Sequence, residues 1–267
     1  MQKASAPWWH LLPVVQWNSW DNQYHLWLTE IIAGRLGTSL QDYSPVQDKV
    51  AKALKVSSII AFPGFGLALI GSFILGFWLT LTPLSLATKW VKQVLYTLDS
   101  VPGFMITLGI FALYLLAGGT LFFASSGMSF TPSTLLGSGC VALFLLPFLS
   151  LFFHQSLQQE ASKLYLRTAQ AKGLSFSQAM VYHALPNALA SSVVVIGDIL
   201  ASLLAGVLIV EVTFSLPGTG SLLAKSLLTQ DYPTVIGLTL FFLLLRTVLM
   251  WTADIVSGLI DPRMKVQ

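Results

Sequence analysis

Charged side chains are scarce in this sequence. Only 9% of its 267 residues are charged, whereas 55% are hydrophobic. A soluble globular domain carries roughly 25% charged residues, so this chain has too few to cover a water-exposed surface. None lies between Val56 and Thr88, and none lies between Ser100 and Gln159. Because about 20 apolar residues cross the hydrocarbon core as a helix, these runs indicate an all-α polytopic membrane protein.

Other absences narrow the function. Cys140 is the only cysteine, so an intrachain disulfide and a cysteine-rich metal site are excluded, and we interpret it as a small buried packing residue. The four histidines are scattered through the sequence, so we predict no metal site and no cofactor: His10, His25, His154 and His183. No basic patch interleaved with aromatic residues suggests a nucleic-acid partner. No G-x-x-x-x-G-K-[ST] motif occurs, so we expect no ATP hydrolysis by this chain and no enzyme activity.

Hydrophobic runs divide the chain into two parts. We expect residues 1–56 to form an extracytoplasmic segment with a short amphipathic helix that begins near Ser44. This helix either lies on the membrane surface or leads into the first span. We expect residues 57–267 to form a transmembrane domain of about five helices. The expected spans are 57–81, 102–123, 134–153, 188–210 and 234–260. Residues 1–20 contain Pro7 and Pro13 and no long apolar core, so they predict neither a span nor an ordinary signal peptide.

Basic residues orient these spans, because Lys and Arg concentrate in cytoplasmic loops. Lys89 and Lys92 follow the first span, and the 154–187 loop carries Lys163, Arg167 and Lys172. The C-terminal tail carries two more basic residues. These three segments are separated by even numbers of spans and therefore share the cytoplasmic side. The turn near Gly127 and the 211–233 loop are then external, as are residues 1–56.

The 154–187 segment has the composition of a helical elbow. Residues 158–172 are strong helix formers, in which Ala161, Leu164 and Ala169 are spaced for a helix. Gly173 is placed as a C-terminal stop, and Ser175 can cap a second helix. Pro186 then falls near the start of the fourth span, where proline is tolerated.

The same segment resembles the cytoplasmic loop of ABC importer permeases, whose pattern is E-A-A, three residues, G, nine residues, I-x-L-P. Here Gly173 is followed by nine residues and then by H-A-L-P, residues 183–186. Arg167-Thr168-Ala169 takes the place of E-A-A, so Arg replaces the Glu and His183 replaces the Ile. The sequence R-T-A-Q-A-K-G-L is similar to the version of this motif in the dipeptide/oligopeptide/nickel branch of the family.

Three other segments resemble this branch in the same order. They are R-L-G-T-S-L-Q-D-Y-S-P-V (35–46), E-V-T-F-S-L-P-G-T-G-S-L-L (211–223) with Q-D-Y-P (230–233), and the ending D-P-R-M-K. The resemblance covers roughly residues 22–265. The family has a six-span core, and its first helix is missing here, so we expect either a misassigned start, a lost helix, or a helix supplied by a partner.

The resemblance implies a function and a set of partners. The chain would be a permease of the bacterial cytoplasmic (inner) membrane that forms a path for peptides or a related small solute. Its partners would be the lipid bilayer, a second homologous permease, two ABC ATPase subunits and an extracytoplasmic substrate-binding protein. The expected coupling residues are Arg167, Thr168, Ala169, Lys172, Gly173, Leu174, His183, Leu185 and Pro186, with Arg167, Ala169, Gly173 and Leu174 as the docking core. The expected external gate residues are Glu211, Phe214, Leu216, Pro217, Gly218, Gly220 and Asp231, with Pro217 and Gly218 in a type II turn.

Charges inside the membrane are functional candidates because burying each one is costly. Besides Glu211, they are Asp198, Arg246 and Asp254. Asp198 and Arg246 are candidates to pair across the last two spans, as a structural pair or as a contact to substrate.

Two other functions remain open. A secondary transporter driven by an ion gradient would need no ATPase partner, but it usually shows internal repeats, and none is evident. A scaffold subunit without a transport path is the second. An intramembrane enzyme is disfavoured because no paired nucleophile and base is evident. Co-purification of an ATPase distinguishes the importer from both alternatives.

Overall fold

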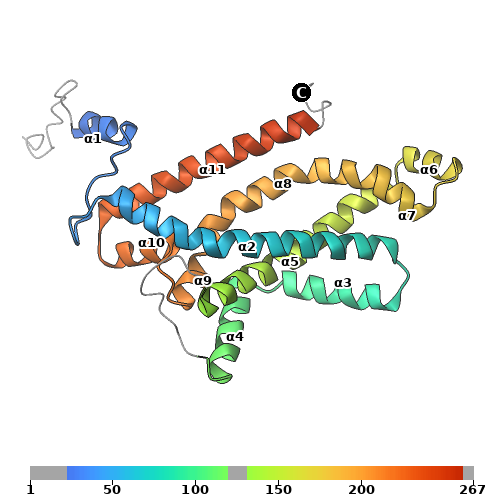
Figure 1. The fold of residues 1–267 in the computed structure, drawn as a ribbon, viewed down its shortest axis with the longest axis horizontal. Coiled ribbons are helices and arrows are strands. Elements are labelled where there is room, and N and C mark those ends of the chain that lie inside the picture. Colours follow the sequence, from blue (N-terminus) through green and yellow to red (C-terminus); the bar gives the residue numbers. More distant parts are fainter. Residues whose placement is uncertain (1–22, 120–130, 261–267) are drawn as a thin grey trace, which may run out of the picture.

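The computed structural model describes residues 23–119 and 131–260, and within these ranges the regular structure is helical apart from one isolated bridge between Thr38 and Pro45. The predicted all-α class is therefore confirmed. The helices form an elongated bundle (Figure 1). The Trp-rich beginning, the turn near Gly127 and the D-P-R-M-K ending lie outside the described residues.

The first span is longer than predicted. Helix α2 (Val46–Leu81) has 36 residues and includes the whole amphipathic segment. Val46 and Val50 are buried against Leu238 of α11 (Tyr232–Ile260), with Leu222 and Leu223 of α10 (Thr219–Leu228) packed alongside. The amphipathic segment is therefore continuous with the helix predicted as the first span and packs against α11.

Helix α2 packs along α5 (Pro132–Ala161), and two glycines allow the close approach. A Cβ on Gly64 would lie 2.6 Å from the carbonyl oxygen of Ser138. A Cβ on Gly76 would lie 2.9 Å from the Cβ of Phe153. Small residues permit such contacts in membranes, where packing rather than water drives helix association. The α2–α5 pair is thus the centre of the bundle.

The second span differs from its prediction. Residues 86–116 form two helices, α3 (Leu86–Asp99) and α4 (Gly103–Leu116), which are bent by 99° at the break between them. Ser85 caps α3, and Leu95 is buried against Leu79 and Leu151. The helix expected over 102–123 begins at Gly103 and ends at Leu116, and residues 120–123 lie outside the described ranges. Four helices are long and apolar enough to cross a membrane, or five if the bent pair counts as one.

The fourth span begins earlier than predicted. One apolar helical run covers 176–213, a length of 38 residues. It joins α7 (Phe176–Ala179), the π-helical turn η3 (Met180–Ala184), α8 (Leu185–Gly206) and α9 (Leu208–Thr213). The elbow's second helix and the fourth span are therefore continuous.

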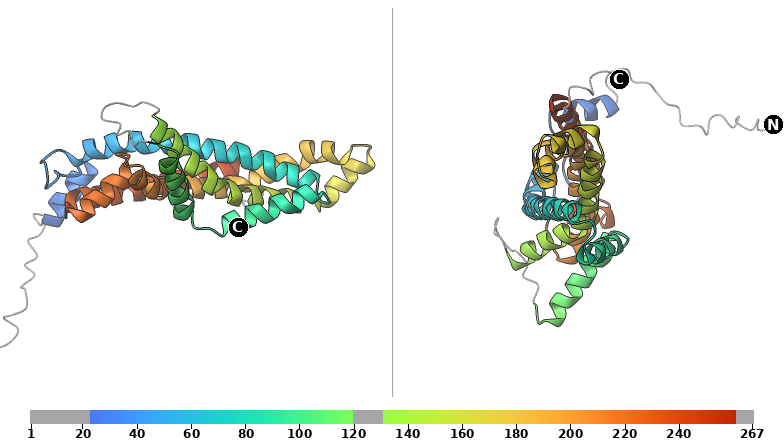
Figure 2. Two further views of the ribbon diagram at one scale, coloured as in Figure 1. Left: turned by 90° about the horizontal axis from the view of Figure 1, so that it is seen from below. Right: turned by 90° about the vertical axis from the view of Figure 1, so that its right-hand side faces the viewer.

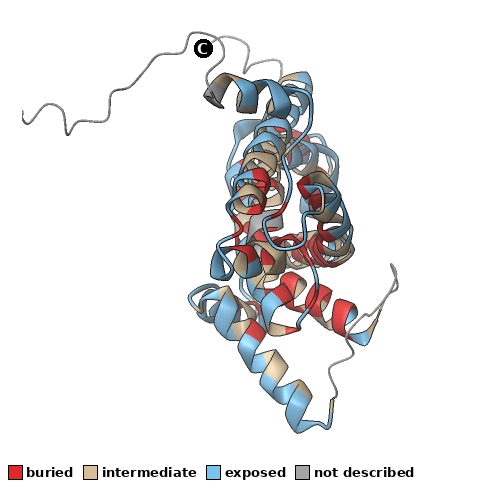
Figure 3. Cartoon of the chain, turned by 90° about the vertical axis from the view of Figure 1, so that its left-hand side faces the viewer, coloured by how far each residue is buried: buried red, intermediate tan, exposed pale blue. Residues whose placement is uncertain are grey.

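The two ends of the bundle carry different features. Helix α10 and the segment that follows α1 (Gln23–Ile32) lie at one end, while α6 (Leu164–Ala171), α7 and the α2–α3 turn lie at the other (Figures 1 and 2). This arrangement agrees with the predicted orientation, in which the elbow and the loop after the first span share a side. Buried residues gather where helices face one another, and the outer faces are exposed (Figure 3).

Candidate functional site

The elbow ends its first helix in a Schellman motif at Gly173. The Gly173 N–H donates to the Gln170 carbonyl at 2.9 Å, and the Leu174 N–H donates to the Ala169 carbonyl at 3.3 Å. Gly173 has a φ of +96°, a region that favours glycine. The predicted helix stop is therefore confirmed.

Ser175 starts the second helix through a capping box. Its Oγ accepts from the Gln178 N–H at 3.3 Å, and Gln178 Oε1 accepts from the Ser175 N–H at 3.0 Å. These bonds satisfy donors that a helix start leaves free. The reversal between the two helices thus has a defined backbone geometry.

The inner face of α6 holds the elbow against the bundle. Leu166 and Ala169 are buried with Ala179 and Met180, and Leu174 is half-buried beside them. Of the expected docking core, Ala169 and Leu174 pack against the bundle, whereas Arg167 and Gly173 are exposed, and docking at these residues stays a prediction. Leu164, which the helical spacing groups with Ala169, is 77% exposed. The spacing of three residues between Leu166 and Ala169 sets the true inner face.

The outer face of the elbow is polar and basic. Arg167, Thr168, Lys172 and Gly173 are exposed there, and so are His183 and Pro186 of the following helix. A pocket of about 320 Å³ lies beside this face. It is lined by Tyr165, Thr168, Ala169, Lys172, Leu174 and His183. Three exposed members of the predicted coupling set, Thr168, Lys172 and His183, therefore line one hollow that has room for a partner side chain.

Three residues that the sequence did not single out anchor the elbow. The buried Glu160 accepts from Tyr165 Oη and from Lys163 Nζ, both at 2.6 Å, and Asn187 Nδ2 donates to the His183 carbonyl at 2.7 Å. Burial, followed by the hydrogen bond to Glu160, raises the pKa of Tyr165 to about 12. The hydroxyl therefore keeps its proton near neutral pH and joins α5 to α6.

The turn at 180–184 lies just before Pro186, the proline predicted near the start of the fourth span. Leu185 N–H donates to the Met180 carbonyl, which makes this turn π-helical, and Pro186 follows in the first turn of α8. Proline has no N–H to donate, and π turns occur where regular helical bonding is interrupted. The hydrogen bonding thus changes from α-helical to π-helical just before Pro186, and the helix continues.

At the other end of the bundle, Glu211 of α9 is fully buried against the N-terminus of α10. Its Oε2 accepts from the N–H groups of Gly220 at 2.8 Å and Ser221 at 3.1 Å, and its Oε1 accepts from Ser57 Oγ at 2.5 Å. Ser57 Oγ also accepts from the Thr219 N–H at 2.8 Å. A carboxylate at a helix N-terminus satisfies free donors and complements the helix dipole. Glu211 therefore joins α2, α9 and α10.

Gly218 corrects the expected type II turn. Its φ is −91° and its ψ is −175°, so it is an extended cap of α10 and not a left-handed turn residue. Its lack of a side chain answers a different need, since a Cβ would lie 2.1 Å from the Glu211 carboxyl group. A Cβ on Gly220 would lie 2.4 Å from the Cα of Leu208. The positive φ values in the 211–233 loop belong to Ser215, at 53°, and to Gln230, at 55°.

The apolar gate residues pack into the bundle. Phe214 and Leu216 are buried in the largest core cluster, and the rings of Phe214 and Phe111 of α4 meet edge to face with centroids 5.2 Å apart. Edge-to-face pairs are a favoured aromatic geometry. The loop between the last two spans is therefore packed as part of the fold.

Asp231 fastens the 35–45 segment to the start of α11. Its Oδ2 accepts from Ser39 Oγ at 2.6 Å and from Thr234 Oγ1 at 2.7 Å, while its Oδ1 accepts from the Leu40 N–H at 3.0 Å. Lys49 Nζ lies 2.8 Å from Asp42 Oδ1 and donates to Ser39 Oγ at 2.8 Å. The segments 35–46 and 230–233, each of which resembles the permease family, thus meet in one polar network.

This network predicts an acid-sensitive external end. Burial opposes ionisation of Asp231, but the bonds from Ser39, Leu40 and Thr234 outweigh it and hold the pKa below its usual 3.8. A group with a lowered folded pKa stabilises the fold above its unfolded pKa, and this stabilisation is lost as pH falls through the folded value. We expect the unfolding temperature of the detergent-solubilised protein to fall as the pH drops below 3.8, and the unfolding temperature of Asp231→Asn to fall less.

The same experiment has a matched control. Asp231→Asn should also cost about 1–3 kcal/mol at pH 7, because bonds to a carboxylate are lost. Asp48→Asn, an exposed position on α2, should leave both the stability and the acid response unchanged. An equal acid response in wild type and Asp231→Asn would show that the network does not depend on this carboxylate.

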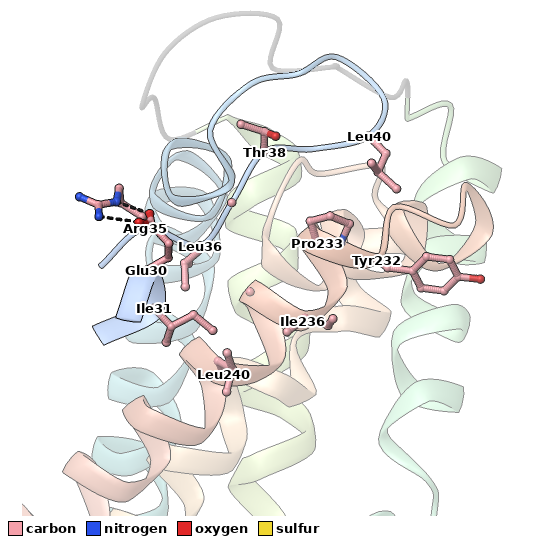
Figure 4. A pocket seen from close by; sticks show the side chains of 12 residues that line it. Glu30, Ile31, Arg35, Leu36, Thr38, Leu40, Tyr232, Pro233, Ile236 and Leu240 are labelled. Carbon is pink, nitrogen blue, oxygen red and sulfur yellow. Dashed lines mark hydrogen bonds and ion pairs between the residues drawn. The ribbon is translucent and has the colours of Figure 1, made fainter. Parts of the chain in front are cut away.

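A pocket of about 470 Å³ lies beside this network, between the 30–40 segment and the first turns of α11 (Figure 4). Ile31, Leu36, Ile236 and Leu240 form its apolar walls, and the Arg35–Glu30 ion pair lies at its edge. Arg35 is the first residue of the segment 35–46, whose sequence resembles that of the permease family. The external end of the protein is therefore hollowed beside α11.

The intramembrane charges divide into a pair and a single residue. Arg246 Nη2 donates to Asp198 Oδ1 at 3.2 Å, which joins α11 to α8 as the sequence suggested. Asp254 is exposed on α11. Sequence reasoning missed Ser57, Ser39 and Thr219, whose only signal was a hydroxyl residue beside or within an apolar run.

Comparisons with known proteins agree with this geometry. Residues 72–266 match the family described as "Binding-protein-dependent transport system inner membrane component". The dipeptide transport system permease protein of Bacillus subtilis (strain 168) is 28% identical over 253 residues, covering 91% of this chain and 79% of that protein. A putative peptide transport system permease protein of Brucella suis is 30% identical over 247 residues, covering 89% and 77%.

A solved structure has the same fold. The crystal structure of an amino acid ABC transporter with histidines superposes with a TM-score of 0.62 at 13% identity, covering 79% of this chain and 94% of that one. The predicted resemblance is confirmed by the family match, and so is the predicted location. The chain therefore belongs to the binding-protein-dependent transport system inner membrane component family, as a multi-pass ABC transporter permease of the inner membrane.

Proposed function

We propose that this permease forms the path of an ATP-driven peptide importer and receives its driving motion through the elbow at residues 154–187. The names of the two relatives support peptides as the solute class. The chain contains no P-loop motif of its own, so ATP would be hydrolysed on separate subunits. The partners in this proposal are two ATPase subunits, a second permease and an extracytoplasmic binding protein.

The exposed basic face of the elbow carries the proposal. Thr168 and Lys172 line a pocket and Arg167 is exposed next to them, while Leu166 and Ala169 pack α6 against the bundle. A partner that moves this face also moves α7 and the long helix that continues from it, because the capping box joins them rigidly. This coupling corresponds to rigid-body motion of packed helices about an interface.

Cysteine crosslinking tests the proposal. In a Cys140→Ala background, Thr168→Cys or Lys172→Cys should crosslink to a co-expressed ATPase subunit, and nucleotide should change the yield. Thr229→Cys, at the opposite end of the bundle, should not crosslink. Crosslinks from Thr229→Cys alone, or uptake that continues in an ATP-depleted membrane with an ion gradient, would favour a gradient-driven carrier instead.

A further inference from the structure

The Asp198–Arg246 pair is unusually exposed for its position. The side chains of Asp198 and Arg246 are 51% and 56% exposed, although both lie in helices long and apolar enough to cross a membrane. One bond joins them, at 3.2 Å. Among the described residues, Asp198 Oδ2 and the other guanidinium N–H groups have no protein partner. The pair therefore retains free donors and a free acceptor that face outward.

Polar residues continue along α8 on both sides of Asp198. They recur at intervals of four or seven residues, which places them on one face of a helix. All are exposed: Asn187, Ser191, Asp198 and Ser202. Val195 fills the remaining position of the stripe and is half-buried. We call this set the α8 stripe.

Helix α11 carries a matching polar stripe next to an apolar one. The polar α11 stripe consists of Thr239, Arg246, Thr247 and Asp254, all exposed, with Leu243 and Met250 between them. The apolar α11 stripe consists of Leu244, Val248, Trp251, Ile255 and Leu259, all exposed. The two stripes recur with the helical period and lie on adjacent sides of the helix. One side of α11 thus suits lipid, and the other suits water.

Energetics separates the environments of the two sides. A charged side chain that faces lipid at the bilayer centre costs about 2.5–3.5 kcal/mol even by the mildest scale. The chain leaves this region uncovered, since only 17% of the most apolar window of α11 is buried, against 56% for α5. Two exposed polar stripes linked by one ion pair are therefore inconsistent with lipid contact. They fit a water-filled path.

We infer that the α8 and polar α11 stripes line the solute path and that Asp198 and Arg246 bind the two ends of a zwitterionic peptide. Arg246 offers a planar set of N–H donors that suits a terminal carboxylate, and Asp198 accepts from a terminal ammonium group. In the empty path the two side chains neutralise each other, and a passing zwitterion replaces each partner with an equivalent one. This inference rests on the proposed function and adds a binding site to it.

Labelling of single cysteines tests the path. The assembled transporter, with its binding protein and ATPase subunits, carries Cys140→Ala and one further change. A membrane-impermeant maleimide should label Ser202→Cys and Thr247→Cys at least roughly tenfold faster than Val248→Cys and Trp251→Cys, because thiolates form in water and not in lipid. Equal labelling of the two α11 stripes would overturn the placement of the path.

Protection from labelling tests the zwitterion. Alanyl-alanine with free ends, added with ATP, should slow labelling of Thr247→Cys, and its N-acetylated, C-amidated form should not. Charge-assisted bonds of this kind correspond to roughly tenfold or more in occupancy. Arg246→Gln and Asp198→Asn should remove the difference between the two peptides, whereas Asp99→Asn, an exposed carboxylate on α3, should keep it. Equal protection by both peptides, no protection by either, or a difference that survives both neutral variants would overturn the inference.

The two proposals fail in different ways. If labelling shows a water-filled path but peptide uptake does not require ATP, the proposed importer function fails. If uptake requires ATP but free and blocked peptides protect Thr247→Cys equally from labelling, the importer function stands and the proposed zwitterion site fails.

Discussion

Replacing Glu211 with leucine should destabilise the external end of the permease more than any other single change at this site. The substitution removes the acceptor for three donors, the N–H groups of Gly220 and Ser221 and the hydroxyl of Ser57. Each buried donor left without a partner costs about 1–3 kcal/mol. We therefore expect loss of folded protein, or a large fall in unfolding temperature together with loss of uptake.

Two comparison variants isolate the cause. Glu211→Gln keeps one carbonyl acceptor and should lose less stability than Glu211→Leu. Glu30→Leu makes the same change at an exposed ion pair, where such pairs are worth about 0–1 kcal/mol, and should have little effect. Thermal unfolding of the solubilised protein measures all three. If Glu211→Leu were as stable as Glu30→Leu, the carboxylate would not be the link between α2, α9 and α10.

Reversing the charge on the outer face of the elbow should separate the permease from its ATPase subunits without unfolding it. Arg167 and Lys172 are exposed, and no shared buried contact depends on them. We expect Arg167→Glu with Lys172→Glu to abolish co-purification of the ATPase and to lower uptake by roughly tenfold or more, as expected for like charges brought together at an interface. The unfolding temperature should stay within a few degrees of wild type, since surface changes usually cost under about 0.5 kcal/mol.

The matched control reverses a charge at the other end. Lys225→Glu on α10 is exposed and should leave ATPase association intact. Undiminished co-purification with the Arg167→Glu, Lys172→Glu permease would contradict docking at this face. A normal level of association with lost uptake would instead place the defect in transmission rather than in binding.

The elbow could be predicted because its turn chemistry is local. Gly173 and Ser175 set the break and the restart by their own backbone and side-chain bonds, and no distant contact is needed to place them. The identity of the inner face was harder to predict. Leu164, Leu166 and Ala169 are all compatible with a helix, and only the neighbouring Leu157 and Met180 decide which of them turn inward.

The bent second span illustrates the opposite case. The basic residues Lys89 and Lys92 indicated a loop, yet residues 86–99 form a helix that packs against α5. Ser85 at its cap was the available signal. Pro102, the N-cap of α4, is a local signal for the break, because a proline disfavours the helical conformation of the residue before it. The 99° angle between the two helices depends instead on what each helix packs against.

The network at Glu211 depends on the tertiary fold alone. Ser57 and Glu211 are separated by 154 positions, and Ser39 and Asp231 by 192. The sequence placed Glu211 and Asp231 among the gate residues by resemblance, but their hydroxyl partners carried no distinguishing pattern. Gly218 was predicted to be a type II turn residue. In the structure it is extended, and its missing side chain leaves room for the Glu211 carboxylate.

The long helical run from 176 to 213 has a mechanical consequence. At 1.5 Å per residue its 38 residues extend for about 57 Å, from the capped start beside Gly173 to the buried carboxylate next to α10. The regular α-helix is interrupted at the π-helical turn 180–184 and at Val207, between α8 and α9. A tilt of the elbow therefore acts on α8 as a lever, and because Asp198 lies on α8 while Arg246 lies on α11, such a tilt changes the distance between the two side chains.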